Sequence, residues 1–238
     1  MKSILVDNRI SEECERSLLR LGLTVMRLPA CRALPEAIES HADTLIFKHK
    51  NDLFTYADYC EEAAYVFSDL RYFYPDLRIH FTSDVPGDKF PEDCKLNALV
   101  MNGRLFARED SLSEAVLDFA KKSGLSTVNV KQGYPACSVL RLSDTHAITS
   151  DKGMAKAIEN QGMTVTLIQS GEIELPPYKY GFIGGACCVF KDTVYFFGDY
   201  TLHPCREKIE SAAKAAGVRL YSLATHPLVD LGGALFFE

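Results

Sequence analysis

Several residues of this sequence can do covalent chemistry, and Cys137 is the first of them. It lies in GYPACSVLRLSDTHAITSD (133–151), directly before an apolar run typical of a strand. A cysteine thiolate is a nucleophile that forms covalent intermediates, but a free cysteine is also among the residue types most often buried in a core. From this segment alone, both interpretations of Cys137 remain open.

The spacing of the eight cysteines argues against a metal or redox motif. No two of them form a CxxC pair, as zinc ribbons and thioredoxin-type sites require. His203 and Cys205 are residue types that bind metals, but two ligands are too few to predict a site. Rossmann-type and P-loop glycine patterns are also missing from the sequence. We therefore expect free thiols, no metal and no nucleotide cofactor.

Composition is that of a globular protein of 238 residues, with 47% hydrophobic residues and a net charge of −6. This charge disfavours a nucleic-acid partner, which needs clustered Lys and Arg, but it is compatible with a small cationic substrate. No run of about 18 apolar residues is present, so no membrane span is expected. The first residues, MKSILVDNRISEE, do not resemble a secretory signal, and we expect a cytoplasmic protein.

The elements that must position Cys137 recur along the chain. Gly22, Gly124, Gly162 and Gly217 each follow a helix-like run and precede a strand-like one. A glycine there can adopt the left-handed conformation that ends a helix. Before three of the helices, the pattern is typical of a strand, a polar turn and a second strand. The predicted unit is therefore strand, turn, strand, helix, strand, repeating every ~40 to 55 residues, as in repeat architectures.

The two ends of the chain complete one unit between them. The first unit, which begins with SILVDNR, has one strand before its helix, and GGALFFE (232–238) supplies a strand at the far end. In the second unit, Pro75 takes the place of the glycine after the helix. A C-terminal strand that joins the N-terminal unit closes a ring and removes its sheet edges. We predict one α/β domain over residues 1–238, built of five units.

Five such units, with small or cysteine residues opening the inner strands, resemble the pentein superfamily. The resemblance implies a five-bladed α/β propeller of strand–strand–helix–strand repeats, closed by the C-terminal strand. The superfamily includes enzymes that modify guanidine groups (arginine deiminase, agmatine deiminase, dimethylarginine dimethylaminohydrolase and the amidinotransferases) and a non-catalytic translation factor that binds the ribosome. The sequence is most similar to a bacterial branch with a circularly permuted order of motifs.

Three short motifs support this resemblance. ACSVL (136–140) is similar to the T-C-C-S-V-L pattern around the family's nucleophile, and HADTLIF (41–47) is similar to its H-x-D motif. LGGA (231–234) keeps the glycines of an E-G-G-D motif and loses both acids. GFIGGACC (181–188) competes for this third match. With LGGA chosen, the motifs follow the family's order around the ring, and the cysteine unit comes two units after the histidine unit.

The resemblance assigns a role to each matched residue. Cys137 would attack a guanidinium carbon, His41 would protonate the leaving amine and then activate water, and Asp43 would bind the guanidinium group. Asp230 is a candidate for the missing second carboxylate. The remaining candidates for substrate contact, two glycines and one residue at the equivalent place in another unit, are Gly232, Gly233 and Asn97.

Plain structural interpretations remain beside these roles. His41 can end a helix over 34–41, and Asp43 can begin a strand. The sequence thus leaves two functions: a cysteine-dependent hydrolase or transferase of a guanidine- or amidine-type small molecule, or a non-catalytic protein that binds a ribosomal or other protein surface. Proximity of Cys137 and His41 in an axial pocket would favour the enzyme, and a separation above about 10 Å would exclude it.

Overall fold

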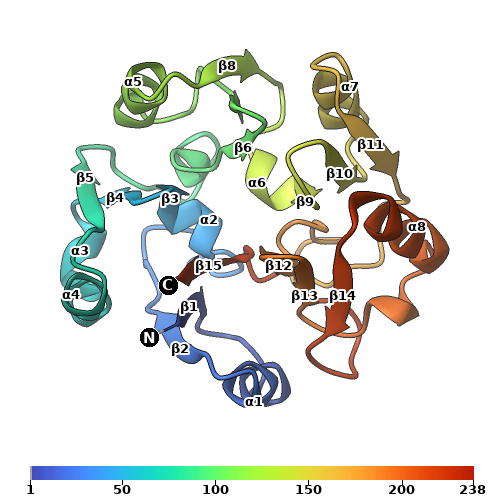
Figure 1. Ribbon diagram of the computed structural model, residues 1–238. Helices are drawn as coiled ribbons and strands as arrows, with labels where there is room; N and C mark the ends of the chain where they lie inside the picture. Colours follow the sequence, from blue (N-terminus) through green and yellow to red (C-terminus); the bar gives the residue numbers. More distant parts are fainter. Residues whose placement is uncertain (1) are drawn as a thin grey trace.

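The computed structural model describes residues 2–238, which form five small sheets of three strands, each with an adjoining helix (Figure 1). Within each sheet the first strand pairs antiparallel with the second, and the second pairs parallel with the third. Figure 1 shows the five units around a common centre, with the first strands nearest to it and the helices at the periphery. The predicted order of elements within a unit is confirmed.

The strands and helices fall into equivalent sets. The first strands are β15 (Ala234–Phe237), β3 (Ile46–His49), β6 (Leu99–Met101), β9 (Val139–Arg141) and β12 (Cys187–Phe190). The second strands are β1 (Ser3–Asp7), β4 (Asp52–Tyr56), β7 (Arg104–Ala107), β10 (His146–Thr149) and β13 (Thr193–Phe196). The third strands are β2 (Thr24–Leu28), β5 (Arg78–Thr82), β8 (Ser126–Asn129), β11 (Thr164–Leu167) and β14 (Arg219–Ser222). The peripheral helices are α1 (Glu12–Arg20), α3 (Tyr59–Glu62), α4 (Ala64–Phe73), α5 (Glu114–Lys122), α7 (Lys152–Glu159) and α8 (Arg206–Ala216).

 

Two further helices, of four residues each, lead directly into first strands: α2 (Ala42–Leu45) into β3, and α6 (Pro135–Ser138) into β9. Two short 3-10 turns complete the set, η1 (Glu92–Cys94) and η2 (Tyr200–Leu202). Among residues 2–238, no helix has the length and apolar character needed to cross a lipid bilayer.

Left-handed glycines connect the helices to the third strands, as predicted. Gly22, Gly124, Gly162 and Gly217 have φ angles of +77°, +75°, +80° and +71°. A residue with a Cβ is strained in this region, so glycine lets the chain reverse at the end of the helix without that cost. In the second unit, α4 ends at Phe73 and Pro75 follows it.

The sheet that joins the two ends of the chain confirms the predicted closure. β15 pairs antiparallel with β1, from Ser3 opposite Phe237 to Val6 opposite Ala234. β1 is also bonded to β2 on its other side and is buried at each of its five residues. The N-terminal unit therefore obtains its first strand from the C-terminus.

Two expectations for the segment before β3 are wrong. Residues 34–41 form turns and no helix, because the backbone N–H of Cys31 donates to the carbonyl of Glu39 and closes this stretch into a loop. His41 therefore lies at the N-terminal boundary of α2, and does not end a helix. Asp43 lies within α2 and does not begin a strand. This loop holds His41 against the centre of the molecule.

Candidate active site

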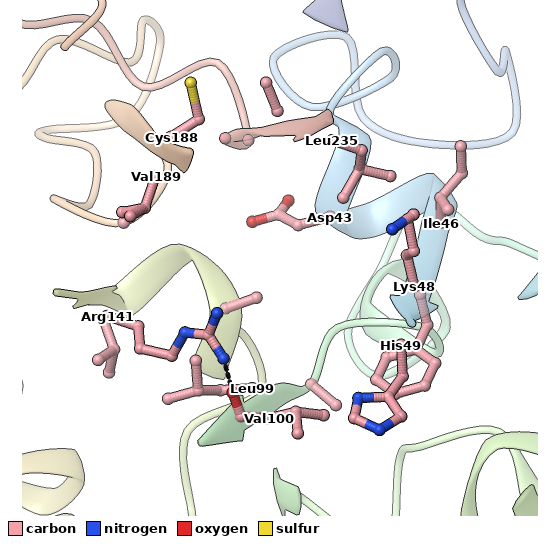
Figure 2. Close-up of a pocket in the computed structure, with 18 of the residues that line it drawn as sticks. Asp43, Ile46, Lys48, His49, Leu99, Val100, Arg141, Cys188, Val189 and Leu235 are labelled. Carbon is pink, nitrogen blue, oxygen red and sulfur yellow. Dashed lines mark hydrogen bonds between the residues drawn. The ribbon is translucent and has the colours of Figure 1, made fainter. Parts of the chain in front are cut away.

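The helices α2 and α6 bring Asp43 and Cys137 together, although the two residues are 94 positions apart. The Cys137 thiol donates a hydrogen bond to Asp43 Oδ2, with a sulfur–oxygen distance of 2.5 Å. Pro135 opens α6, where its fixed φ suits the first turn of a helix. α2 ends directly before β3 and α6 ends directly before β9, so both side chains lie at the start of first strands. Figure 2 shows Asp43 among the residues that line a pocket.

Asn97 comes to the same place from the third unit. Its Oδ1 accepts a hydrogen bond from the backbone N–H of Ala136 at 2.8 Å, which fixes the orientation of the amide. Its Nδ2 then lies 3.8 Å from Cys137 Sγ and donates to the sulfur. Asn97 is buried, so its amide is a fixed part of the surroundings of the thiol.

His41 and Asp230 complete the cluster. One ring nitrogen of His41, the Cys137 sulfur and one Asp230 oxygen all lie within 4.8 Å of one another. Both ring nitrogens of His41 are buried and have no hydrogen-bond partner among the described residues. His41 Nε2 also lies 3.7 Å from Asp7 Oδ2. The cysteine and the histidine predicted from separate motifs thus meet in space.

Backbone groups and glycines determine how closely these side chains pack. Asp230 accepts hydrogen bonds from the N–H groups of Phe182 at 2.8 Å and Gly232 at 3.0 Å. A Cβ at Gly185 would overlap the Asp230 carboxylate, and a Cβ at Gly232 would overlap His41. Gly232 also has a φ of +65°, which favours glycine. Glycine pairs from two units are therefore needed for this packing.

Burial and neighbouring charges change the pKa values of the four ionisable groups. Burial raises the pKa of the Cys137 thiol well above its usual value, and the charges of Asp43 and Asp230 raise it further. Burial also raises the pKa of Asp43, and the hydrogen bond from Cys137 opposes this increase. Burial raises the pKa of Asp230 as well, and there the nearby His41 opposes the increase. Burial lowers the pKa of His41, against the opposing effect of Asp230. At neutral pH the resting site therefore holds a neutral thiol beside a neutral imidazole.

A small chamber, here called the aromatic chamber, opens onto this cluster. Its volume is about 240 Å³. Its lining consists of three polar site residues, one threonine and six apolar or aromatic residues: His41, Cys137, Asp230, Thr44, Ile38, Leu175, Phe182, Tyr134, Tyr178 and Tyr180. Tyr178 and Tyr180 are partly exposed, so the chamber reaches the surface beside them. Tyr134 is held by a hydrogen bond from its hydroxyl to Asp93 Oδ2 at 2.6 Å.

Asp43 faces a different cavity, which is lined by the first strands themselves. This cavity has a volume of about 460 Å³ and is shown in Figure 2. Asp43 is of intermediate exposure, but its Oδ1 atom is buried and has no hydrogen-bond partner among the described residues. The hydrogen bond between Cys137 and Asp43 therefore links a residue of the aromatic chamber to a residue of the second cavity.

Comparison with known proteins places the chain in a family. Its residues 5–235 match a group described as "Family of unknown function (DUF6873)". The chain belongs to the DUF6873 family. No curated protein matches the sequence.

Solved structures of guanidine-modifying enzymes share the fold of this DUF6873 chain. A dimethylarginine dimethylaminohydrolase variant, in an adduct with S-methyl-L-thiocitrulline, is 13% identical with a TM-score of 0.59, covering 94% of this chain and 92% of its own. The inosamine-phosphate amidinotransferase of Streptomyces griseus is 14% identical with a TM-score of 0.54, and the match covers 92% of this chain and 77% of that enzyme. The agmatine deiminase of C. jejuni is 8% identical with a TM-score of 0.55, covering 94% and 87%. The predicted resemblance to the pentein superfamily is confirmed at the level of the fold.

The candidate site of this DUF6873 chain also has ligands for a metal ion. His41, Cys137 and Asp230 offer a nitrogen, a sulfur and an oxygen within 4.8 Å of one another, a set that suits zinc. The unpartnered ring nitrogens of His41 fit such an ion. The sequence predicted no metal, and these three residues are the ones that would hold one.

Sequence reasoning missed Asp7 and Arg9. Arg9 binds the Asp7 carboxylate through its backbone N–H at 2.7 Å, its Nε at 3.0 Å and its Nη2 at 2.6 Å, and Asp7 in turn lies against His41. The available signal was an acid that ends the apolar strand SILVD. The choice between two glycine pairs was also unnecessary, because Gly185 and Gly232 both border the site.

Proposed function

We propose that this protein is a cysteine-dependent enzyme that modifies a guanidine- or amidine-type small molecule. One observation carries the proposal: two carboxylates, Asp43 and Asp230, flank the Cys137 thiol, and none of the described residues within hydrogen-bond distance of these three is a Lys or an Arg. A guanidinium ion supplies a positive charge and planar N–H donors, which suit two carboxylates. The unpartnered Asp43 Oδ1 is one acceptor available to it.

A bound cation would also activate the nucleophile. The charges of Asp43 and Asp230 contribute to the raised pKa of the Cys137 thiol. A guanidinium ion between them offsets these charges, so the pKa of the thiol falls when the substrate binds. Cys137 is then a thiol at rest and a thiolate only in the complex.

The chemical steps follow from the neutral state of His41. His41 accepts the thiol proton, and Cys137 Sγ forms a bond to the guanidinium carbon. His41 then gives this proton to the leaving amine nitrogen as its bond to carbon breaks. Water next loses a proton to His41 and attacks the carbon, the carbon–sulfur bond breaks, and the same proton returns to the sulfur. The net result is hydrolysis to a urea and an amine, while an amine acceptor in place of water would give transfer.

The lining of the aromatic chamber limits which guanidine compounds can bind. No Lys or Arg is among the described residues that line it, whereas three tyrosines are. An acidic group on the substrate would find no partner there, but an apolar tail would be buried, and the tyrosine rings can face a cation. We therefore expect alkylguanidines to be better substrates than arginine. Asn97, Gly232 and Gly233 remain candidates for contact with the guanidinium end.

The fold proposed for this activity is the five-bladed α/β propeller of the penteins, as one domain over residues 1–238. The arrangement of five units around a common centre supports it (Figure 1).

Trapping the covalent intermediate tests the function. Butylguanidine, agmatine, arginine and methylated arginines are incubated with the native protein and with His41→Asn, which cannot activate water. Intact-mass spectrometry of the acid-quenched native protein should detect the substrate minus its amine, and peptide mapping should locate it at Cys137. His41→Asn, which can neither take the thiol proton nor protonate the leaving amine, should form no adduct. The matched variant His203→Asn, which changes a buried histidine away from the cluster, should turn over like the native protein. Absence of both amine release from the native protein and an adduct would contradict the proposal.

A non-catalytic binding protein is the second candidate. The thiol has an exposed fraction of only 3%, and its pKa is raised, as in an inert core cysteine. A guanidine that binds and is recovered unchanged, with the same affinity in Cys137→Ala, would favour this function, as would capture of a protein partner that is insensitive to the substitution.

A further inference from the structure

The cavity beyond Asp43 has a strongly basic rim, and we call it the basic vestibule. Of the described residues that line it, Lys48, His49, Lys50 and Arg141 are basic and Asp43 is the single acid. Figure 2 shows Lys48, His49 and Arg141 around the opening, with Asp43 between them. A local excess of positive charge is unusual in a chain whose net charge is −6.

The basic side chains come from two units and face a common space. Lys48 and His49 lie on β3, and Arg141 ends β9. Burial lowers the pKa of His49, and the charges of Lys50 and Arg141 lower it further, so a charge from each of the two units acts on His49. Because like charges from facing strands repel, their proximity costs free energy unless an anion joins them.

The two lysines lack carboxylate partners. The Lys48 ammonium lies 5.2 Å from the centre of the Phe237 ring, and among the described residues neither Lys48 nor Lys50 forms an ion pair. Lys48 is half-buried, and burial lowers its pKa. Arg141 is only loosely paired, at 3.7 Å from Asp144, and donates to the carbonyl of Val100 at 3.0 Å.

Deeper in, the walls of the vestibule are aliphatic. They include side chains of four first strands, among them Leu99, Val139, Val189 and Leu235. Apolar walls of low dielectric focus the field of the basic rim and strengthen its attraction for anions. They also offer an apolar surface to a ligand that enters past the rim. The negative charge of Asp43 at the inner end keeps an anionic group at the outer end.

We propose that the basic vestibule binds a small organic anion, with its charged group at Lys48, Lys50 and Arg141 and its apolar body against the aliphatic walls. This site is separate from the aromatic chamber and does not depend on the proposed enzymatic function. The same positive rim repels guanidinium ions, so the substrate of the proposed enzyme would enter through the aromatic chamber.

Titration calorimetry with matched probes tests this site. Hexanoate carries a carboxylate and an apolar tail, hexylammonium carries the tail with the opposite charge, and inorganic phosphate has no tail. Hexanoate should bind the native protein at one site and lose affinity as salt is added, while hexylammonium should not bind. Phosphate should bind more weakly than hexanoate. Equal binding of hexylammonium, or phosphate binding as tight as that of hexanoate, would overturn the proposal.

Substitutions locate the site. Lys48→Met keeps the apolar stem over Phe237, and Arg141→Gln keeps a donor for the Val100 carbonyl. Each substitution should weaken hexanoate binding about tenfold, because it removes one charge contact. The controls Lys121→Met and Arg206→Gln change basic residues on peripheral helices and should leave the affinity unchanged. If native protein and both rim variants bind hexanoate equally, the ligand lies elsewhere and the proposal is wrong.

Discussion

Cys137 and Cys187 lie near the start of the first strands of two neighbouring units, yet their surroundings differ. Cys137 lies in α6, two residues before the start of β9, and Cys187 is the first residue of β12. Their exposed fractions are 3% and 2%. The Cys137 thiol faces the Asp43 carboxylate and the Asn97 amide. The Cys187 thiol donates to backbone carbonyls, that of Ile183 at 3.1 Å and that of Gly184 at 3.8 Å.

Under the proposed function, this difference separates a reactive thiol from a structural one. Burial raises the pKa of both thiols, so burial does not distinguish them. What distinguishes Cys137 is a set of ionisable neighbours whose charge a substrate can offset. The hydrogen bonds of Cys187 go to peptide carbonyls, and Asp230 acts on its pKa only through charge, after burial and Cys188. Of these two thiols, the proposed function uses Cys137, because Asp43, His41 and Asp230 from other units lie beside it.

Replacing each of the two cysteines by alanine should show the largest difference between them, in the rate of turnover. Cys137→Ala removes the nucleophile and should lower kcat with the best guanidine by about a thousandfold or more. Cys187→Ala removes a thiol that contacts only backbone, and should leave kcat within about threefold of native. Amine release measured on both variants at equal folded concentration checks this. Equal losses in the two variants would remove the distinction.

The turn before Cys187 gives a second test, because it also packs against the site. Gly185→Ala places a Cβ on the Asp230 carboxylate and should destabilise the protein by about 2–3 kcal/mol. Gly162→Ala, at a left-handed position with no heavy atom within 4 Å of the new Cβ, should cost about 1 kcal/mol. Urea unfolding of both variants measures the difference. A Gly185→Ala protein no less stable than Gly162→Ala would mean that Asp230 is not held tightly.

The pH dependence of stability should show the smallest effect. Burial raises the folded-state pKa of Asp43, so between its unfolded and folded values the folded protein binds more protons. The free energy of unfolding therefore falls as pH rises through that window, and Asp43→Asn abolishes this fall.

We accordingly expect Asp43→Asn to raise the free energy of unfolding at pH 8 by about 1–2 kcal/mol, and to have less effect at pH 4. In Cys187→Ala the change should be the same at both pH values, because its thiol has no carboxylate partner. Thermal unfolding at the two pH values measures this, and a pH-independent effect of Asp43→Asn would contradict it.

Local sequence signals were sufficient to predict the repeating unit and the pairing of the C-terminal strand with the N-terminal unit. Gly124 ends a helix because its own backbone can be left-handed, and this depends on no distant residue. The pairing of β15 with β1 followed from a missing strand at one end and a surplus strand at the other. Residues 34–41 were predicted wrongly, because a hydrogen bond from Cys31 to Glu39 outweighs their helical pattern.

For the candidate site, the sequence by itself determined which residue types can do the chemistry, since the motifs around His41 and Cys137 are short and continuous. Only the tertiary structure decided their partners. Asp43 meets Cys137 across 94 positions, and Asp7 meets His41 from another unit, because contact between units depends on how the units pack around the centre. The charges of the basic vestibule lie in two separate units for the same reason. No local pattern encodes such distances, so the contacts between units appear only in the folded structure.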